Sequence, residues 1–105
     1  MALTARAAEI ASNFNRQAGV RTALARIAQP GGQGATTFLK VSTDAEEIAA
    51  RMDRDARQGQ PLPPTAGLIV SIKDLFDVAD DVTTAGSVLL RDTAPATRDA
   101  EAVRR

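Results

Sequence analysis

The sequence predicts an α/β fold made mostly of helices with one central strand. Three alanine-rich segments carry apolar residues at helical spacing, which is typical of helices that pack one face against another layer. A single run, Leu68–Ile72, is β-rich and apolar on both faces apart from Ser71, the pattern of a strand covered on two sides. Such a strand needs neighbours, and the chain offers no second strong strand. The pattern therefore favours part of a larger sheet, and a small helical protein with one extended segment is the alternative.

Residues 1–30 are predicted to form the N-terminal helices. Leu3–Gln17 is alanine-rich with helical spacing, and Arg21–Ala28 is a second helical run. Pro30 and the glycines after it end this run. Thr37–Val41, "TFLKV", is then expected to be a short extended segment.

Residues 43–57 are predicted to form a helix. Thr43 is followed three residues later by Glu46, which is the spacing of a capping box at a helix N-terminus. The expected apolar face of this helix consists of Ala45, Ile48, Ala49, Met52 and Ala56.

Residues 58–66, "QGQPLPPTA", are predicted to be a proline-rich connector, because closely spaced prolines remove donors from both helices and sheets. Residues 67–105 are predicted to hold the strand that ends in a lysine, a turn at "TTAGS" and the start of a next helix. Gly86 is expected to turn the chain into a short helical piece, and Thr97 to cap the last helix.

The composition of the 105 residues excludes several classes of function. With 13 basic and 13 acidic residues and neither sign concentrated, nothing predicts a nucleic-acid or anionic-membrane partner. No apolar run approaches the roughly 18 to 20 residues of a membrane span, and the N-terminus lacks the order of a secretory signal, so we expect a cytoplasmic protein. Alanine makes up nearly half of the hydrophobic residues, which predicts a thin core.

The chain contains neither cysteine nor histidine. It therefore cannot form a thiolate-imidazole zinc site, a cysteine nucleophile or a serine-histidine dyad, and we expect neither a metal nor a cofactor. Any acid-base chemistry must come from Lys, Asp or Glu, which directs attention to Lys73.

Lys73 stands at the end of the apolar run, in "LIVSIKDLFDV". Desolvation disfavours the ammonium form, so a lysine at the end of a buried strand can act as a base near neutral pH. The alternative is a structural lysine whose ammonium reaches solvent at the strand end and pairs with Asp74 or Asp77.

The segment 66–105, "AGLIVSIKDLFDVADDVTTAGSVLLRDTAPATRDAEAVRR", resembles the amidase signature family. The likeness lies in the Val-Ser-Ile-Lys-Asp run, the "TTAGS" segment and the "DAEAVRR" helix, in the same order and at the family's spacing. It implies the N-terminal portion of the amidase signature fold, a mixed sheet flanked by helices, so that residues 1–105 would be a partial amidase domain.

The resemblance implies a Ser, cis-Ser, Lys triad in which Lys73 is the base. In that family the neutral lysine takes a proton from a bridging serine, which relays it from the nucleophilic serine as that serine attacks an amide carbonyl. Ammonia or an amine leaves, and water releases a carboxylic acid. Backbone amides of a glycine-rich loop stabilise the oxyanion. The implied substrate is a small-molecule amide, whose identity and binding residues stay unknown.

The serine-bearing segments of the family do not occur in these 105 residues, and neither Ser71 nor Ser87 has their motif. We therefore expect the chain to be inactive by itself. The alternative is a non-enzymatic interaction module derived from an amidase, and self-association through unpaired strand edges is a further expectation.

Three positions depart from the family pattern: Thr65 stands where leucine is common, Ile69 where proline is common, and Asp80 where glycine is common. If position 80 requires a positive φ, aspartate there costs about 1 kcal/mol. The "KDLFDV" segment favours the general amidase branch over the tRNA-dependent amidotransferase subunits.

Overall fold

The structure, a computed structural model, describes residues 15–105. The predicted helix over Leu3–Gln17 lies outside these residues apart from its last positions. The chain divides into two compact units, Met1–Ile69 and Val70–Arg105, and each is described by itself. Among the described residues no helix is both long and apolar enough to cross a bilayer.

Helix α2 spans Arg16–Ile27 and confirms the predicted helical run, but it begins five residues earlier than Arg21. It begins there because the Asn15 side-chain oxygen accepts a hydrogen bond from the Ala18 N–H at 2.8 Å, capping the N-terminus. The helix ends at Ile27, and the N–H of the C-cap residue Ala28 donates to the Leu24 carbonyl at 3.0 Å.

Helix α3 is a single turn, Gly34–Thr37, so the first residue of the predicted extended segment is helical. The chain becomes extended at Phe38, with φ −112° and ψ 124°. The Thr36 and Thr37 hydroxyls both donate to the Gln33 carbonyl, which favours the helical turn locally.

Helix α4 spans Ala45–Arg57 and confirms the helix predicted over 43–57. The predicted capping box is wrong, because the N-cap residue is Asp44 and its side chain makes no capping hydrogen bond. Glu46 cannot complete a capping box, since its carboxylate binds the side chains of Arg21 and Gln17 instead. The Glu46 carboxylate thus binds two side chains of α2 and not the N-terminus of its own helix.

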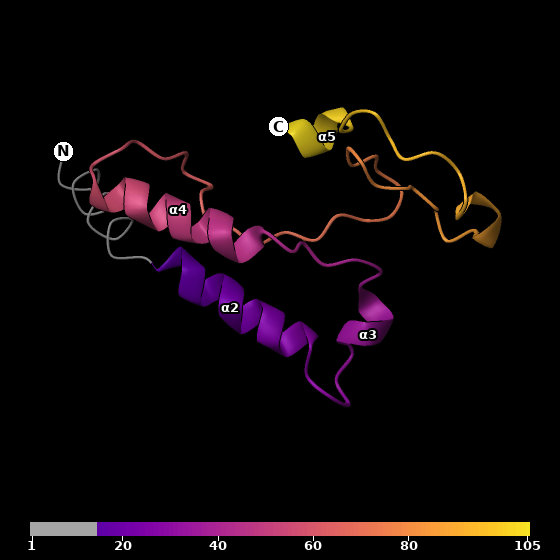
Figure 1. Cartoon of the computed structure of the whole chain (residues 1–105), viewed down its shortest axis with the longest axis horizontal. Helices are drawn as coiled ribbons and strands as arrows, with labels where there is room; N and C mark the ends of the chain where they lie inside the picture. The colour runs from indigo at the N-terminus through magenta and orange to yellow at the C-terminus, as the bar shows by residue number, and fades with distance from the viewer. Residues whose placement is uncertain (1–14) are drawn as a thin grey trace. The chain divides into compact units, whose positions relative to one another are not determined.

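Helices α2 and α4 lie side by side and run in opposite directions (Figure 1). Arg21 in the middle of α2 binds Glu46 in the first turn of α4, whereas the start of α2 meets Asp53 towards the end of α4. The buried apolar side chains of the described residues, Val20 and Ala49, come one from each helix. This helix pair is the organising contact of its unit.

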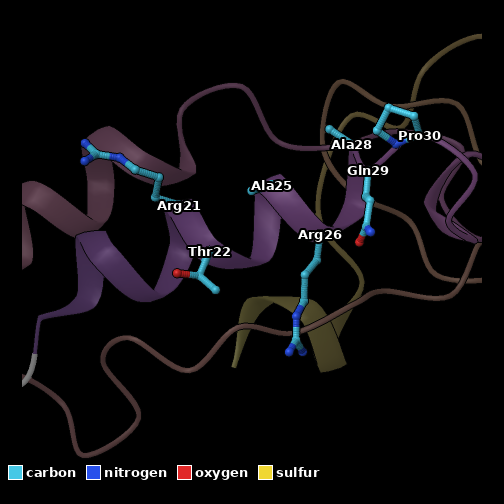
Figure 2. A pocket seen from close by; sticks show the side chains of 7 residues that line it. All are labelled: Arg21, Thr22, Ala25, Arg26, Ala28, Gln29 and Pro30. Atoms are coloured by element: carbon cyan, nitrogen blue, oxygen red, sulfur yellow. The ribbon is translucent and has the colours of Figure 1, made fainter.

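An open hollow lies over the second half of α2 and the turn that follows it (Figure 2). Its lining includes two guanidinium groups, from Arg21 and Arg26, which point in different directions. Because Arg21 already binds Glu46, the two cations do not converge on a common point. The hollow does not have the convergent polar groups of a ligand site.

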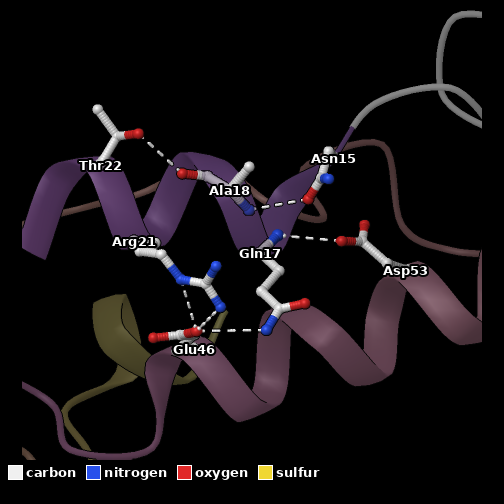
Figure 3. A network of polar contacts seen from close by, with 7 residues as sticks. All are labelled: Asn15, Gln17, Ala18, Arg21, Thr22, Glu46 and Asp53. Carbon is white, nitrogen blue, oxygen red and sulfur yellow. Dashed lines mark hydrogen bonds and ion pairs between the residues drawn. The ribbon is translucent and has the colours of Figure 1, made fainter.

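The start of α2 is held by Asp53 of α4 (Figure 3). One carboxylate oxygen accepts from the Arg16 N–H at 3.1 Å and from the Arg16 guanidinium at 3.3 Å. The other accepts from the Gln17 N–H at 3.0 Å. Asp53 and Asn15 together satisfy the first three N–H groups of the helix, which have no partner within it.

Arg16 and Asp53 are 4% and 7% exposed, so this ion pair is buried. Burial by itself raises the pKa of Asp53, but the amides of Gln17 and Arg16 and the Arg16 guanidinium outweigh it, and the net pKa is lowered. Arg16 also donates from Nε to the Ala66 carbonyl at 3.1 Å. The connector predicted at 58–66, which contains neither helix nor strand, is thereby tied to α2 at its end.

The predicted strand Leu68–Ile72 is not present, and residues 15–105 contain no β-strand. Its side chains are also not buried: Val70 is 75% exposed and Ile72 is 46% exposed. The side-chain pattern suits a strand covered on both faces, but a strand also needs a hydrogen-bonding neighbour, and no described segment supplies one. The fold is therefore mostly helical, and it fits the α/β class only coarsely.

The unit Val70–Arg105 contains the 3₁₀ turn η1, Val88–Leu90, and the short helix α5, Glu101–Arg104. The first confirms the short helical piece expected after Gly86. Thr97 does not cap the last helix, because the N-cap is Ala100. The chain before α5 is instead held by tertiary contacts, in which the Ala100 N–H donates to the Asp77 carbonyl at 2.8 Å.

Candidate active site

Lys73 lies in a tight turn rather than at the end of a buried strand, and it is exposed. Its carbonyl accepts hydrogen bonds from the Leu75 N–H at 2.7 Å and from the Phe76 N–H at 3.1 Å. The expectation of a strand-end lysine desolvated within this chain is therefore wrong, because the segment before it has no covering layer among the described residues.

Asp74, the next residue, binds the "TTAGS" segment. Its carboxylate accepts the Thr84 N–H at 2.9 Å on one oxygen and the Thr84 hydroxyl on the other. The Thr84 hydroxyl, followed by the Thr84 amide and more weakly the Ala85 and Gly86 amides, lowers the pKa of Asp74. Two motifs that the sequence places ten residues apart are thus one structural unit.

Asp77 has a similar partner, because its carboxylate accepts the Thr83 hydroxyl at 2.7 Å. The alternative in which Lys73 pairs with Asp74 or Asp77 is therefore not observed: the ammonium makes no ion pair with any residue of the described range 15–105. Both neighbouring carboxylates bind threonines instead.

The "TTAGS" segment forms a turn with two successive left-handed residues, Ala85 at φ 49° and Gly86 at φ 75°. The Ser87 N–H closes the turn on the Thr84 carbonyl at 2.8 Å. The Ser87 side chain then accepts from the Leu89 N–H at 3.3 Å, which caps η1. Ser87 therefore has a structural role in the unit.

Asp80 has a φ of 68°, so position 80 requires the left-handed conformation that the family pattern suggested. The Asp80 N–H donates to the Ala96 carbonyl, and the Ala96 N–H donates to the Asp81 carbonyl, both at 2.9 Å. The Asp99 carboxylate accepts the Ala79 N–H at 2.7 Å beside them. These contacts fix residues 77–81 against residues 96–100.

Among the described residues, no three acidic, cysteine or histidine side chains gather closely enough to hold a metal ion. The chemically distinctive arrangement in residues 70–105 is therefore an exposed lysine beside an aspartate that anchors a threonine turn. Sequence reasoning missed the part played by Thr84, although the two motifs that meet there were both visible.

The turn that carries Lys73 is thus joined to the "TTAGS" turn by the hydrogen bonds between Asp74 and Thr84. The sequence model of the family described as Amidase matches residues 18–105. The chain therefore belongs to the amidase family, a family of hydrolases.

Two curated relatives agree with this assignment. The AtzE subunit of the 1-carboxybiuret hydrolase of Pseudomonas sp. (strain ADP) is 39% identical over 69 residues, which are 66% of this chain and 14% of the relative. A glutamyl-tRNA(Gln) amidotransferase subunit of Salinispora tropica is 45% identical over 60 residues, which are 55% of this chain and 12% of the relative. The chain thus spans a small part of each relative's length.

No solved structure gives a significant match to the chain. One of the two relatives is named for a hydrolase and the other for an amidotransferase, so they lie on both sides of the distinction expected from "KDLFDV". The assignment to the general amidase branch stays a prediction.

Proposed function

We propose that this chain is the N-terminal part of an amidase signature hydrolase that cleaves carboxamides to a carboxylate plus ammonia or an amine. The observation that carries the proposal is the family match over residues 18–105, which includes Lys73 and both motifs that meet at Thr84. Lys73 is the proposed base of a Ser, cis-Ser, Lys triad.

In this mechanism Lys73 accepts a proton from a bridging serine while a second serine attacks the amide carbon. The proton relayed to Lys73 is then available to the leaving amine, and water hydrolyses the acyl-enzyme. Neither serine segment occurs in these 105 residues. The exposure of Lys73 is consistent with an amine that meets its partners on another segment of polypeptide.

The first test is activity of the chain by itself. We expect no ammonia release above background from simple aliphatic and aromatic amides, because removing members of a catalytic unit leaves little of its rate enhancement. Ammonia release that Lys73→Ala abolishes would contradict the proposed inactivity. Sequencing the DNA after the codon for Arg105 would show whether a serine-bearing segment follows.

The second test supplies the serines. The matched segment of the AtzE protein is replaced by the corresponding residues of this chain, and hydrolysis of 1-carboxybiuret is measured in that enzyme. We expect the chimera to be active and Lys73→Ala to lower its kcat by roughly 10³-fold or more. Lys40→Ala, the chain's other lysine, is the matched control and should leave kcat unchanged. Equal activity of the Lys73→Ala and unsubstituted chimeras would reject Lys73 as the base.

A non-enzymatic interaction module is the second candidate, and the exposure of the apolar run favours it. Leu68, Ile69 and Val70 are all more than half exposed, which is unusual for consecutive large apolar residues. This function predicts a defined complex. An expanded or polydisperse species in size-exclusion chromatography with light scattering would count against it.

A further inference from the structure

The Asp74 carboxylate stands directly after Lys73 in the sequence but is directed to a different partner. Both of its oxygens accept from Thr84, one from the N–H at 2.9 Å and the other from the hydroxyl. A carboxylate that accepts two or more donors in fixed directions cannot turn towards a neighbouring side chain without losing them.

This arrangement matters for a lysine that has to act as a base. An adjacent carboxylate favours the ammonium form of a lysine, whereas a base needs the neutral amine. Asp74 is the acidic residue nearest to Lys73 in the sequence, and its carboxylate accepts hydrogen bonds from Thr84. Asp77, the next one, accepts the Thr83 hydroxyl at 2.7 Å.

The backbone of Lys73 is fixed from the other side as well. Its carbonyl accepts from the Leu75 and Phe76 N–H groups. The peptide that carries the amine is thus held between its own turn and the anchored side chain of the following residue. Release of Asp74 would remove one of these two constraints and create a counter-ion at the same time.

We propose that Thr84 is a positioning residue for Lys73, acting through Asp74. By binding the Asp74 carboxylate, Thr84 keeps that carboxylate away from the ammonium and holds the lysine turn in place. The catalytic meaning of this role rests on the proposed function, but the contact itself does not.

The test measures acylation of the lysine amines in the 105-residue chain by acetic anhydride at pH 8, with peptide mass spectrometry. The chain has two lysines, so Lys40 is an internal reference for Lys73. Thr84→Val removes the hydroxyl donor and leaves the Asp74 oxygen that accepted it open to Lys73, while the Thr84 N–H can still bind the other oxygen. We expect the Lys73 to Lys40 reactivity ratio to fall about two- to fivefold, the range that corresponds to an exposed ion pair.

Two further variants show that the effect passes through Asp74. Thr84→Ser keeps a hydroxyl and should retain the original ratio. Adding Asp74→Asn to Thr84→Val removes the carboxylate charge and should restore it. Thr93→Val is the matched control, because it removes a hydroxyl that binds the Leu90 carbonyl in the same unit. It should leave the ratio unchanged.

The amide of Ala96, which donates to the Asp81 carbonyl, reports by hydrogen exchange whether the unit is folded. If Thr84→Val abolishes the protection of the Ala96 amide, the unit has unfolded, and the single variant Asp74→Asn is measured instead. In that variant the asparagine oxygen can still accept the Thr84 N–H, so the turn is retained while the carboxylate charge is removed. A ratio within about 1.5-fold of the original supports the proposal, whereas a two- to fivefold rise means that Asp74 pairs with Lys73 and overturns it. An unchanged ratio in a folded Thr84→Val chain also overturns it. None of these readouts requires amide hydrolysis, so they are independent of the proposed function.

Discussion

Two aspartates organise the described part of the chain, one in each unit. Asp53 accepts the first two N–H groups of α2, and Asp74 accepts donors from the turn at Thr84. A short carboxylate can satisfy several backbone amides at once, which explains why both sites tolerate a charged residue. Asp53 could have been suspected from the sequence, because it lies on the same helical face as Ala49 and Ala56.

We predict that Asp53→Asn lowers the free energy of unfolding by about 1–3 kcal/mol at pH 7, because a buried charged donor loses its counter-ion. Urea denaturation followed by circular dichroism measures this change. Asp55→Asn is the matched control, since the Asp55 carboxylate makes no hydrogen bond or ion pair with the described residues. An equal loss in both variants would contradict the assigned role of the buried pair.

The stability that the Arg16–Asp53 pair contributes should depend on pH. The pKa of Asp53 is lowered in the folded chain, so its stabilisation is present above the ordinary aspartate value of about 3.9 and is lost as the pH falls through the folded value. The stability difference between the original chain and Asp53→Asn should therefore shrink below about pH 4. A difference that grows on acidification would reverse this sign and contradict the prediction.

At the scale of the elements, local patterns predict the main helices, whereas contacts between residues far apart in the chain decide the partners of their charged side chains. The helical spacing over 43–57 is sufficient to predict α4, because an amphipathic helix is defined by residues three and four apart. Glu46 also fits a local cap, yet Arg21 and Gln17 bind it. A strand needs a hydrogen-bonding partner from another part of the chain. The side-chain pattern of Leu68–Ile72 therefore led to a strand prediction that the structure does not bear out.

The junction between α2 and α3 offers a test of close packing. A Cβ added at Gly34 would lie 1.9 Å from the Ile27 carbonyl oxygen, which is backbone and cannot move aside freely. We expect Gly34→Ala to lower the free energy of unfolding by about 1–3 kcal/mol, measured by thermal denaturation.

Gly19→Ala is the matched control for this substitution. Gly19 lies inside α2, and an added Cβ would meet nothing within 4 Å. Alanine has the better helix propensity, so this variant should gain about 0.5–1 kcal/mol. Stabilisation by both substitutions would show that Gly34 does not lie against the Ile27 carbonyl.

At the scale of the whole molecule, the described residues bury little and expose much. The buried apolar side chains among them are Val20 and Ala49, whereas ten large apolar side chains are exposed. Between Ile69 and Ile72, no backbone N–H donates to another backbone group of residues 15–105. A run with exposed apolar side chains and open backbone donors favours pairing with another chain.

We therefore predict that the 105-residue chain self-associates with increasing concentration, and that Val70→Lys weakens this association. Val70 lies in the middle of the apolar run, and a charge there opposes edge-to-edge pairing. Sedimentation equilibrium of both chains measures the effect, which we expect to be about tenfold or more in the dissociation constant, or roughly 1.4 kcal/mol. Leu39→Lys, at an exposed position outside the run, is the control. A chain that stays monomeric over the whole range would contradict the prediction.

The sequence by itself determined the helical runs that form α2 and α4, the turn at Gly86 and the family, because each depends on residues close together in the chain. Only the tertiary structure decided four other features. These are the binding of Glu46 to α2, the burial of Asp53, the absence of a strand among the described residues, and the hydrogen bonds between Asp74 and Thr84. Each of these depends on which of several possible donors or neighbours comes within hydrogen-bonding distance, and a local pattern does not contain that information.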